Sequence, residues 1–268
     1  MEYILETKGV TKRFGGLVAV DAVDFQVSRG EIRGLIGPNG SGKSTLLNLI
    51  SGVYVPDEGD VYFNGQPITR LAPHRIAELG IARTFQNNRL FLNLSIQENV
   101  MVGRHCRTRS ELSHALFRPR SAKAEMNDTR QKALECLEFV GLNRPPDFVT
   151  SGLPHGERRL LEIARALATD PALILLDEPA TGMNPSEKER IVDVIRKIRD
   201  SGITVVIIEH NMRVVMGISD RVTVLNFGRK IAEGTPKEIQ HNPDVIEAYL
   251  GEDDEEEGFD DAAQARES

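Results

Sequence analysis

The feature that most constrains this chain is a glycine-rich octapeptide at residues 37–44 with the pattern G-x-x-x-x-G-K-[ST]. It follows an apolar segment, Glu31–Ile36, whose length and composition suit a β-strand. It leads into Lys43–Ser51, which predicts a helix ended by Gly52. A strand, a glycine-rich turn and a helix in this order are typical of one end of a parallel sheet covered by helices. The sequence therefore predicts an α/β fold.

The octapeptide also has the chemistry of a phosphate-binding loop. Glycines let the backbone wrap closely, so that successive N–H groups and the start of the helix face an anion. Lys43 can place a positive charge on β- and γ-phosphate oxygens, and the Ser44 hydroxyl can ligate Mg²⁺. A glycine-rich loop without a nucleotide is the alternative, and the flanking strand and helix argue against it. We expect ATP to be bound by Gly37, Pro38, Asn39, Gly40, Ser41, Gly42, Lys43, Ser44 and Thr45.

Two further apolar segments end in polar residues. Leu173–Leu176 precedes Asp177 and Glu178, and Ile203–Ile208 ends shortly before His210. Carboxylates are costly in a core, so these acids should emerge at the carboxyl edge of the sheet, where a phosphate loop also lies. We expect Asp177 to hold the Mg²⁺ shell and Glu178 to orient or deprotonate an attacking water. His210 is expected to contact the γ-phosphate, with a structural histidine as the alternative.

The chain between these segments predicts one helix with a defined start. Asn184 is suited to the N-cap, Pro185 to the first helical position and Glu187 to the third. Apolar residues then recur at helical spacing at Ile191, Val194, Ile195 and Ile198. The order is therefore strand, helix, parallel strand.

Two parts of the chain outside the predicted parallel sheet have different structures. Tyr3–Val10 and Val18–Val27 predict strands, with a slip near Ala22, and Asn64-Gly65 predicts a hairpin turn. These segments indicate a small antiparallel sheet. Residues 88–168 contain amphipathic stretches and predict a helical lobe.

Composition excludes several classes of protein. The chain has 33 Lys and Arg against 40 Asp and Glu, but residues 251–268 alone hold nine acids and one arginine, so the remainder is nearly neutral. The acidic end predicts a disordered tail. No basic stripe is interleaved with stacking aromatics, which argues against a nucleic-acid partner. No apolar run approaches the roughly 18 residues of a membrane-spanning helix, and the N-terminus lacks a secretory signal, so we expect a cytoplasmic location.

Taken in order, these motifs resemble the ATP-binding cassette (ABC) ATPases over residues 3–250. Phe14, in Arg13–Gly16, looks like the aromatic residue that stacks on adenine in that family. Gln86, in Arg83–Gln86, is similar to the glutamine that contacts Mg²⁺ or the attacking water. The resemblance implies a P-loop NTPase core with an N-terminal antiparallel β-subdomain and an inserted helical subdomain.

Two motifs depart from the family pattern. Leu153–Glu157, followed by an expected helix over Leu160–Leu167, falls where the family has its signature sequence. The resemblance implies that Gly156 offers backbone N–H groups to a γ-phosphate on a second subunit, although Pro154 replaces a serine and Glu157 a glutamine. Asn184 stands where many relatives have an aspartate.

The resemblance also implies how the chain is divided into domains. Residues 1–86 and 160–250 would form the nucleotide-binding core, residues 87–159 the helical subdomain with the signature loop, and residues 251–268 the acidic tail. Segments including Arg83–Phe91, a basic stretch over Arg104–Lys123 and Gly182–Pro185 look like the ATP-binding subunits of branched-chain amino acid importers.

Such a subunit pairs with a second ATP-binding subunit, as a homodimer or with a sister cassette. It docks on integral membrane permeases at the inner face of the membrane and serves a periplasmic or extracellular solute-binding protein indirectly. The alternatives are cassettes for urea, amides or lipid export, a soluble ABC ATPase acting on DNA or ribosomes, and a P-loop kinase. The kinase would leave Gly156, Glu178 and His210 without a role.

Overall fold

A computed structural model describes residues 3–84, 90–107 and 119–249 of the protein. The described residues form two compact units, one falling within residues 1–70 and 206–268 and the other within residues 71–205. Gln86 and the acidic tail lie outside the described residues, as does the middle of the basic stretch. The predicted boundaries at residues 86/87 and 159/160 stay a prediction. Within the described ranges, no helix combines the length and apolar character that a membrane span requires.

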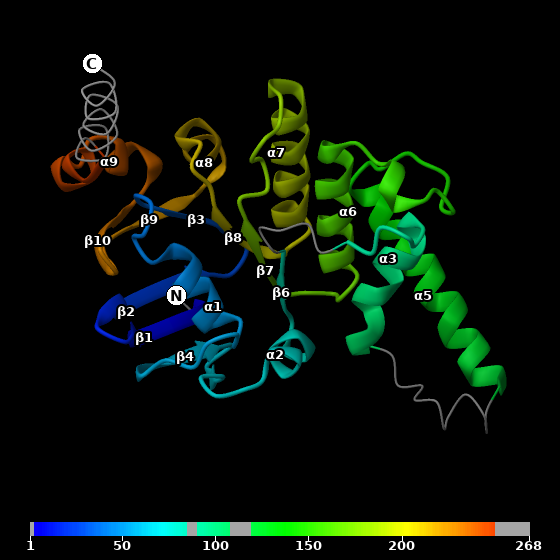
Figure 1. The fold of residues 1–268 in the computed structure, drawn as a ribbon, viewed down its shortest axis with the longest axis horizontal. Helices are drawn as coiled ribbons and strands as arrows, with labels where there is room; N and C mark the ends of the chain where they lie inside the picture. The colour runs from blue at the N-terminus through cyan, green and yellow to red at the C-terminus, as the bar shows by residue number, and fades with distance from the viewer. Residues whose placement is uncertain (1–2, 85–89, 108–118, 250–268) are drawn as a thin grey trace, which may run out of the picture. The chain divides into compact units, whose positions relative to one another are not determined.

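The first unit contains the predicted antiparallel sheet (Figure 1). In sheet order its strands are β2 (Leu17–Ser28), β1 (Tyr3–Phe14), β4 (Glu58–Phe63) and β5 (Gln66–Pro67). Ala22, at φ 49°, accompanies register shifts between β1 and β2, which confirms the predicted slip. Asn64 and Gly65, at φ 51° and 74°, form the predicted hairpin turn between β4 and β5. The strand β1 continues past Val10 because an irregular register near Gly9 absorbs the break in its pattern.

A second group of strands in the same unit carries the phosphate loop. The strand β3 (Ile32–Ile36) pairs in parallel with β9 (Arg221–Asn226), and β9 pairs antiparallel with β10 (Arg229–Gly234). The helices of this unit are α1 (Lys43–Ile50), α8 (Met212–Ile218), α9 (Pro236–Gln240) and a helical segment over residues 243–249. Their core includes Ile36, Val215, Val222, Val224, Ile239 and Val245. The loop therefore begins at the end of a fully buried strand.

The second unit combines two parallel strands with a helical lobe (Figure 1). The strands are β6 (Ile81–Arg83) and β7 (Leu173–Asp177). The helices are α2 (Pro73–Leu79), α3 (Ile96–Gly103), α5 (Pro119–Phe139), α6 (His155–Leu167) and α7 (Pro185–Asp200), with short 3₁₀ turns at Arg104–Arg107 and Thr150–Gly152. The helix α3 packs against both α5 and α6, which confirms the helical lobe. The strand β8 (Thr204–Ile208) spans the sequence boundary between the units.

The start of α7 has the predicted capping box. Asn184 Oδ1 accepts a hydrogen bond from Glu187 N at 2.9 Å, and Glu187 Oε2 accepts one from Asn184 N at 3.1 Å. The four predicted apolar residues of α7 are buried. In contrast, α6 begins at His155, five residues before the expected Leu160, because Pro154 O accepts the first helical hydrogen bond from Arg158 N.

Candidate functional site

The phosphate loop depends on close backbone approaches that exclude side chains. A Cβ atom on Gly37 would lie 2.0 Å from Leu225 O, and one on Gly42 would lie 2.4 Å from Ala19 O. Both glycines also have positive φ, at 147° and 102°. Gly40 differs, because its Cβ would meet nothing within 4 Å and only its φ of 74° favours glycine. The loop is therefore packed tightly at its two ends and open in the middle.

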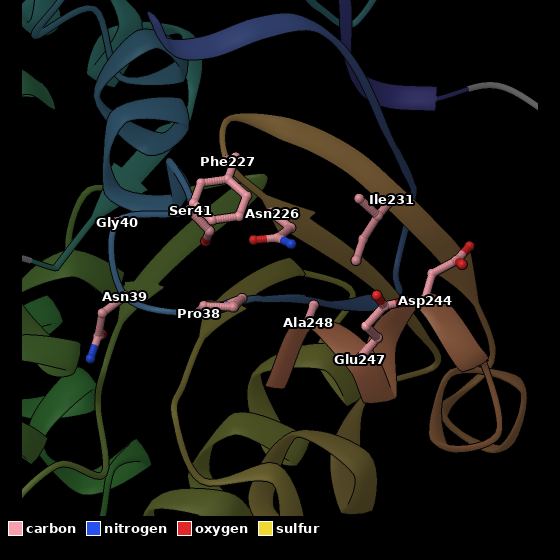
Figure 2. Close-up of a pocket in the computed structure, with 10 residues that line it drawn as sticks. All are labelled: Pro38, Asn39, Gly40, Ser41, Asn226, Phe227, Ile231, Asp244, Glu247 and Ala248. Atoms are coloured by element: carbon pink, nitrogen blue, oxygen red, sulfur yellow. The ribbon is translucent and has the colours of Figure 1, made fainter. Parts of the chain in front are cut away.

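The turn between β9 and β10 is hydrogen-bonded to the phosphate loop. Gly228 N donates to Ser41 O at 3.0 Å, and Asp21 N donates to Gly228 O at 2.9 Å. Figure 2 shows this turn, through Asn226 and Phe227, alongside Pro38–Ser41. The shape of the phosphate loop is thus held by a hairpin far away in the sequence.

Lys43 directs its charge into the loop. Its Nζ donates to Gly37 O and Pro38 O, both at 2.7 Å, and to Ser41 Oγ at 3.3 Å, and the residue is only 6% exposed. A buried ammonium held by carbonyl oxygens can exchange them for the more strongly charged oxygens of a phosphate. The loop is therefore arranged to receive an anion at Lys43.

The start of α1 adds backbone donors to this charge. Its N-cap, Gly42, offers no side-chain cap, and its first turn contains no acid. The first N–H groups of a helix lack helical partners and favour an anion. The Ser44 hydroxyl follows on an exposed side chain, where Mg²⁺ can reach it, and Thr45 is half-buried beside it.

A cavity of about 590 Å³ is lined in part by the phosphate loop (Figure 2). Residues 38–41 form one wall, and the turn at Asn226 and Phe227 forms the next. Asp244 and Glu247, on the C-terminal helical segment, close it. These carboxylates would repel an anion, so we expect phosphates to bind at the start of α1 and not in this cavity.

Phe14 presents an exposed ring at the end of β1. The residue is 43% exposed, and its ring packs edge-on against Tyr54, with centroids 5.3 Å apart and planes at 71°. Lys12 Nζ lies 5.7 Å from the ring centroid and donates to Asp57 Oδ1 at 3.0 Å. The ring is thus exposed at the end of β1 beside Tyr54 and Lys12, and its stacking on adenine stays a prediction.

Asp177 is buried in the second unit with half of its carboxylate unused. Its Oδ2 accepts from Arg83 Nη2 at 3.0 Å, and its backbone N donates to Thr84 Oγ1 at 3.3 Å. Its Oδ1 is buried and has no hydrogen-bond partner among the residues that the structure describes. Buried acceptors are rarely left unsatisfied. This free carboxylate oxygen suits the hydrated shell of Mg²⁺, so the residue present fits the metal predicted there.

Glu178 has a strained backbone. Its φ is 50°, a conformation uncommon for a residue other than glycine, and the residue is 7% exposed. Thr181 Oγ1 donates to Glu178 Oε2 at 3.4 Å. Such conformations are concentrated at functional sites, where they fix the direction of a side chain. The carboxylate is therefore held at the end of β7, where the sequence places the base.

His210 lies in the first unit, directly after β8. The residue is exposed, whereas the preceding Glu209 is 3% exposed. Asn211, the next residue, caps α8 by accepting from Val214 N at 3.2 Å. The imidazole is thus on an exposed connection between a buried strand and a capped helix, which argues against the alternative of a core histidine.

Gly156 lies in the first turn of α6, packed against the start of α7. A Cβ there would lie 2.6 Å from Glu187 Oε1, so the Glu187 side chain would have to shift for any larger residue at this position. Pro154 gives α6 no side-chain cap. Beside it, Arg144 binds Glu157 with two hydrogen bonds, Nε to Oε2 at 2.9 Å and Nη2 to Oε1 at 3.0 Å.

The predicted site residues fall into one group in each unit. Phe14, the phosphate loop and His210 belong to the first, and Asp177, Glu178 and Gly156 to the second. Sequence reasoning missed the partners that hold them, namely Arg83, Arg144 and Gly228. Arg83 belongs to the Arg83–Gln86 motif, and no local pattern singles out the other two.

The family comparisons agree with the motifs. Residues 20–181 match the family described as ABC transporter, and residues 229–255 match the one described as branched-chain amino acid ATP-binding cassette transporter. The first match covers more than half of the chain. This confirms the family and the fold class that the sequence predicts.

Individual relatives extend over almost the whole chain. The high-affinity branched-chain amino acid transport ATP-binding protein BraF of Pseudomonas aeruginosa is 42% identical over 93% of this chain and 98% of its own length. LivG of Escherichia coli K12, with the same description, is 41% identical over the same shares. A crystal structure of an ATP-binding cassette of an ABC transporter in its ADP conformation has a TM-score of 0.81 and 36% identity, covering 94% of this chain and all of its own. The chain belongs to the ABC transporter family of ATP-binding cassettes.

Proposed function

We propose that this cassette hydrolyses ATP to drive an importer for branched-chain amino acids. The observation that carries ATP binding is the phosphate loop, in which Lys43 and the uncapped start of α1 supply positive charge at one place. The names of BraF and LivG support the solute class, since both match nearly full length. The match of residues 229–255 to the family described as branched-chain amino acid ATP-binding cassette transporter supports the same assignment.

In this proposal both groups of residues have roles in binding and hydrolysing ATP. Phe14 stacks on adenine, and the loop holds the phosphates. Glu178 takes a proton from the attacking water, while His210 contacts the γ-phosphate and keeps that water aligned. Gln86, which lies outside the described residues, contacts the same water or the metal. Gly156 contributes backbone N–H groups to an ATP bound by a second cassette.

Mg²⁺ is the implied metal, and Ser44, Asp177 and Gln86 would hold it. When bound, it neutralises charge on the β- and γ-phosphates. The proposal is supported by Arg83, which binds one oxygen of Asp177, while the other is buried without a hydrogen-bond partner among the described residues.

The proposal places this cassette on permease subunits at the cytoplasmic face of a membrane, paired with a copy of itself or a sister cassette. A solute-binding protein outside the membrane delivers the amino acid. Transport of urea or amides, lipid export, and action on DNA or ribosomes are the competing outcomes. The family match to transporters favours the import complex over the last of these.

The first test is phosphate release by the purified full chain with MgATP. We expect hydrolysis to ADP and phosphate without any acceptor, which a small-molecule kinase would not show. Lys43→Ala should weaken ATP binding severely. Lys8→Ala removes a lysine that is exposed and paired with Glu6 at 3.2 Å, and should bind ATP normally. Equal ATP affinity in the two variants would contradict the assignment of the loop.

The second test addresses the transport complex. The tagged chain is purified from membranes, and the co-purifying chains are identified and reconstituted in vesicles with their binding protein. Uptake of leucine, isoleucine or valine that needs ATP supports the proposal. Permeases that transport urea, amides or lipid would contradict the solute assignment and leave the ATPase assignment intact.

A further inference from the structure

Two carboxylates lie at the start of α6. Glu157 occupies its third position, and Glu187 Oε1 lies where a side chain on Gly156 would be. A γ-phosphate approaching the backbone N–H groups here would meet both carboxylates. Like charges at short range repel, so another group must offset this repulsion if the helix is to receive ATP.

Glu157 cannot use the capping arrangement seen at three other helices. In α3, α7 and α9 a glutamate at the third position accepts from the N-cap backbone N–H. The N-cap of α6 is Pro154, which has no N–H to donate. The carboxylate of Glu157 is therefore free to turn to another donor.

That donor is Arg144. Its guanidinium binds both oxygens of Glu157, at 2.9 and 3.0 Å, and its Cζ lies 5.3 Å from the ring centroid of Phe148. Paired bonds of this kind fix orientation as well as charge. The nearby Arg158 is engaged differently, because Nε donates to Leu153 O and Nη2 to Ser151 O, both at 2.9 Å.

We infer that Arg144 is a positioning residue that neutralises Glu157, so that the start of α6 can accept the γ-phosphate of ATP held by the second cassette. The inference rests on the proposed function. It states that pairing of the two cassettes depends on the neutralisation of Glu157 by Arg144. The signature sequence here lacks the usual serine and glutamine. Arg144 acts through Glu157 and the local charge, without taking part in hydrolysis.

The test uses the full chain carrying Glu178→Gln, which slows hydrolysis, and measures MgATP-dependent dimerisation by analytical ultracentrifugation. Adding Arg144→Ala should raise the protein concentration needed for half-dimerisation about tenfold at low salt, and the defect should shrink as salt rises. Arg75→Ala is the matched control, since Arg75 forms an exposed pair with Glu78 at 2.7 Å. It should dimerise like the parent.

Glu157→Gln separates charge compensation from a structural bridge. Both substitutions disrupt the paired hydrogen bonds, so a purely structural role predicts that both weaken dimerisation. Charge compensation instead requires that Glu157→Gln dimerise at least as well as the parent, and that Arg144→Ala with Glu157→Gln return to within about twofold of it. Equal weakening by the two single variants would overturn the inference, as would no weakening by Arg144→Ala. A parent that fails to dimerise with ATP would contradict the proposed function itself.

Discussion

Arg83 and Asp177 form a buried ion pair that uses only one side of the carboxylate. Nη2 of Arg83 lies 3.0 Å from Oδ2 of Asp177, and Oδ1 is buried without a hydrogen-bond partner in the part of the chain that the structure describes. The side chains are 8% and 3% exposed. The pair therefore occupies one carboxylate oxygen, and the other is the oxygen that we propose for the Mg²⁺ site.

Arg83→Met should destabilise the protein strongly. It leaves the charge of Asp177 buried without its partner, a loss that typically costs about 3–5 kcal/mol. Urea unfolding measures the difference. Arg75→Ala, which breaks an exposed pair with Glu78, should cost about 1 kcal/mol or less. A similar small cost for both variants would contradict a stabilising role for the buried pair.

Glu178→Gln should lower the rate of ATP hydrolysis about 100-fold or more while preserving ATP binding, because it keeps the size of the side chain but removes the base. Phosphate release and nucleotide binding are measured on the same preparation. Glu189→Gln, at an exposed position of α7, is the matched control and should hydrolyse ATP normally. Turnover near that of the unchanged protein would show that Glu178 is not the base.

Gly37→Ala and Gly40→Ala should differ sharply. The first places a methyl group 2.0 Å from Leu225 O and must displace the loop or β9, so both ATP affinity and thermal stability should fall. The second meets no atom within 4 Å and costs about 1–2 kcal/mol through its left-handed backbone alone. Calorimetry and nucleotide titration compare them. Equal effects would mean that packing against β9 does not shape the loop.

The ion pairs of Asp170 should make stability depend on pH. Burial raises the pKa of this carboxyl, but the hydrogen bonds and charges of Lys132 at 2.8 Å and Arg104 at 2.6 Å outweigh it and hold the pKa below its usual value. A lowered pKa contributes stability above the unfolded pKa, about 4, and loses it as pH falls through the folded one. The stability advantage over Asp170→Asn should be full at neutral pH and shrink below about pH 4.

Urea midpoints measured across this pH range test the prediction. Asp193→Asn is the control, because Asp193 is exposed and its ion pair with Arg196 is longer, at 3.5 Å. An advantage of Asp170 that grew on acidification would contradict the assigned direction.

Cys136 should react slowly with thiol reagents. Burial raises the pKa of its thiol to about 11, so the reactive thiolate is scarce at pH 8. A chain carrying Cys106→Ser isolates the reaction of Cys136 with iodoacetamide. The folded protein should label at least about 100-fold more slowly than the same protein in urea. Fast labelling of the folded protein would show an accessible thiol.

Local chemistry explains what the sequence could predict. The phosphate loop, the Asn64-Gly65 turn and the cap at Asn184 each depend on residues within a few positions of one another, and all three are found. The early start of α6 was missed because its first turn, from His155, contains a glycine and charged residues and no apolar repeat.

The features that the sequence does not predict come from pairing between distant residues. Arg83 and Asp177 are 94 positions apart, and the approach of Gly228 to Ser41 joins opposite ends of the chain. No periodicity or motif marks such partners, because each is set by how strands and turns pack. Arg144 and Glu157 are only 13 positions apart, yet their pairing depends on the loop that returns from α5 to α6.

The turn between β9 and β10 has a consequence for how this protein can change over time. Exposed hairpin turns usually accept insertions and deletions freely. Here Phe227 is 86% exposed, but the next residue, Gly228, is tied to Ser41 and Asp21 through its backbone. A turn one residue longer would withdraw that support from the phosphate loop. The length of this turn is thereby tied to the shape of the phosphate loop, although the turn is far from that loop in sequence.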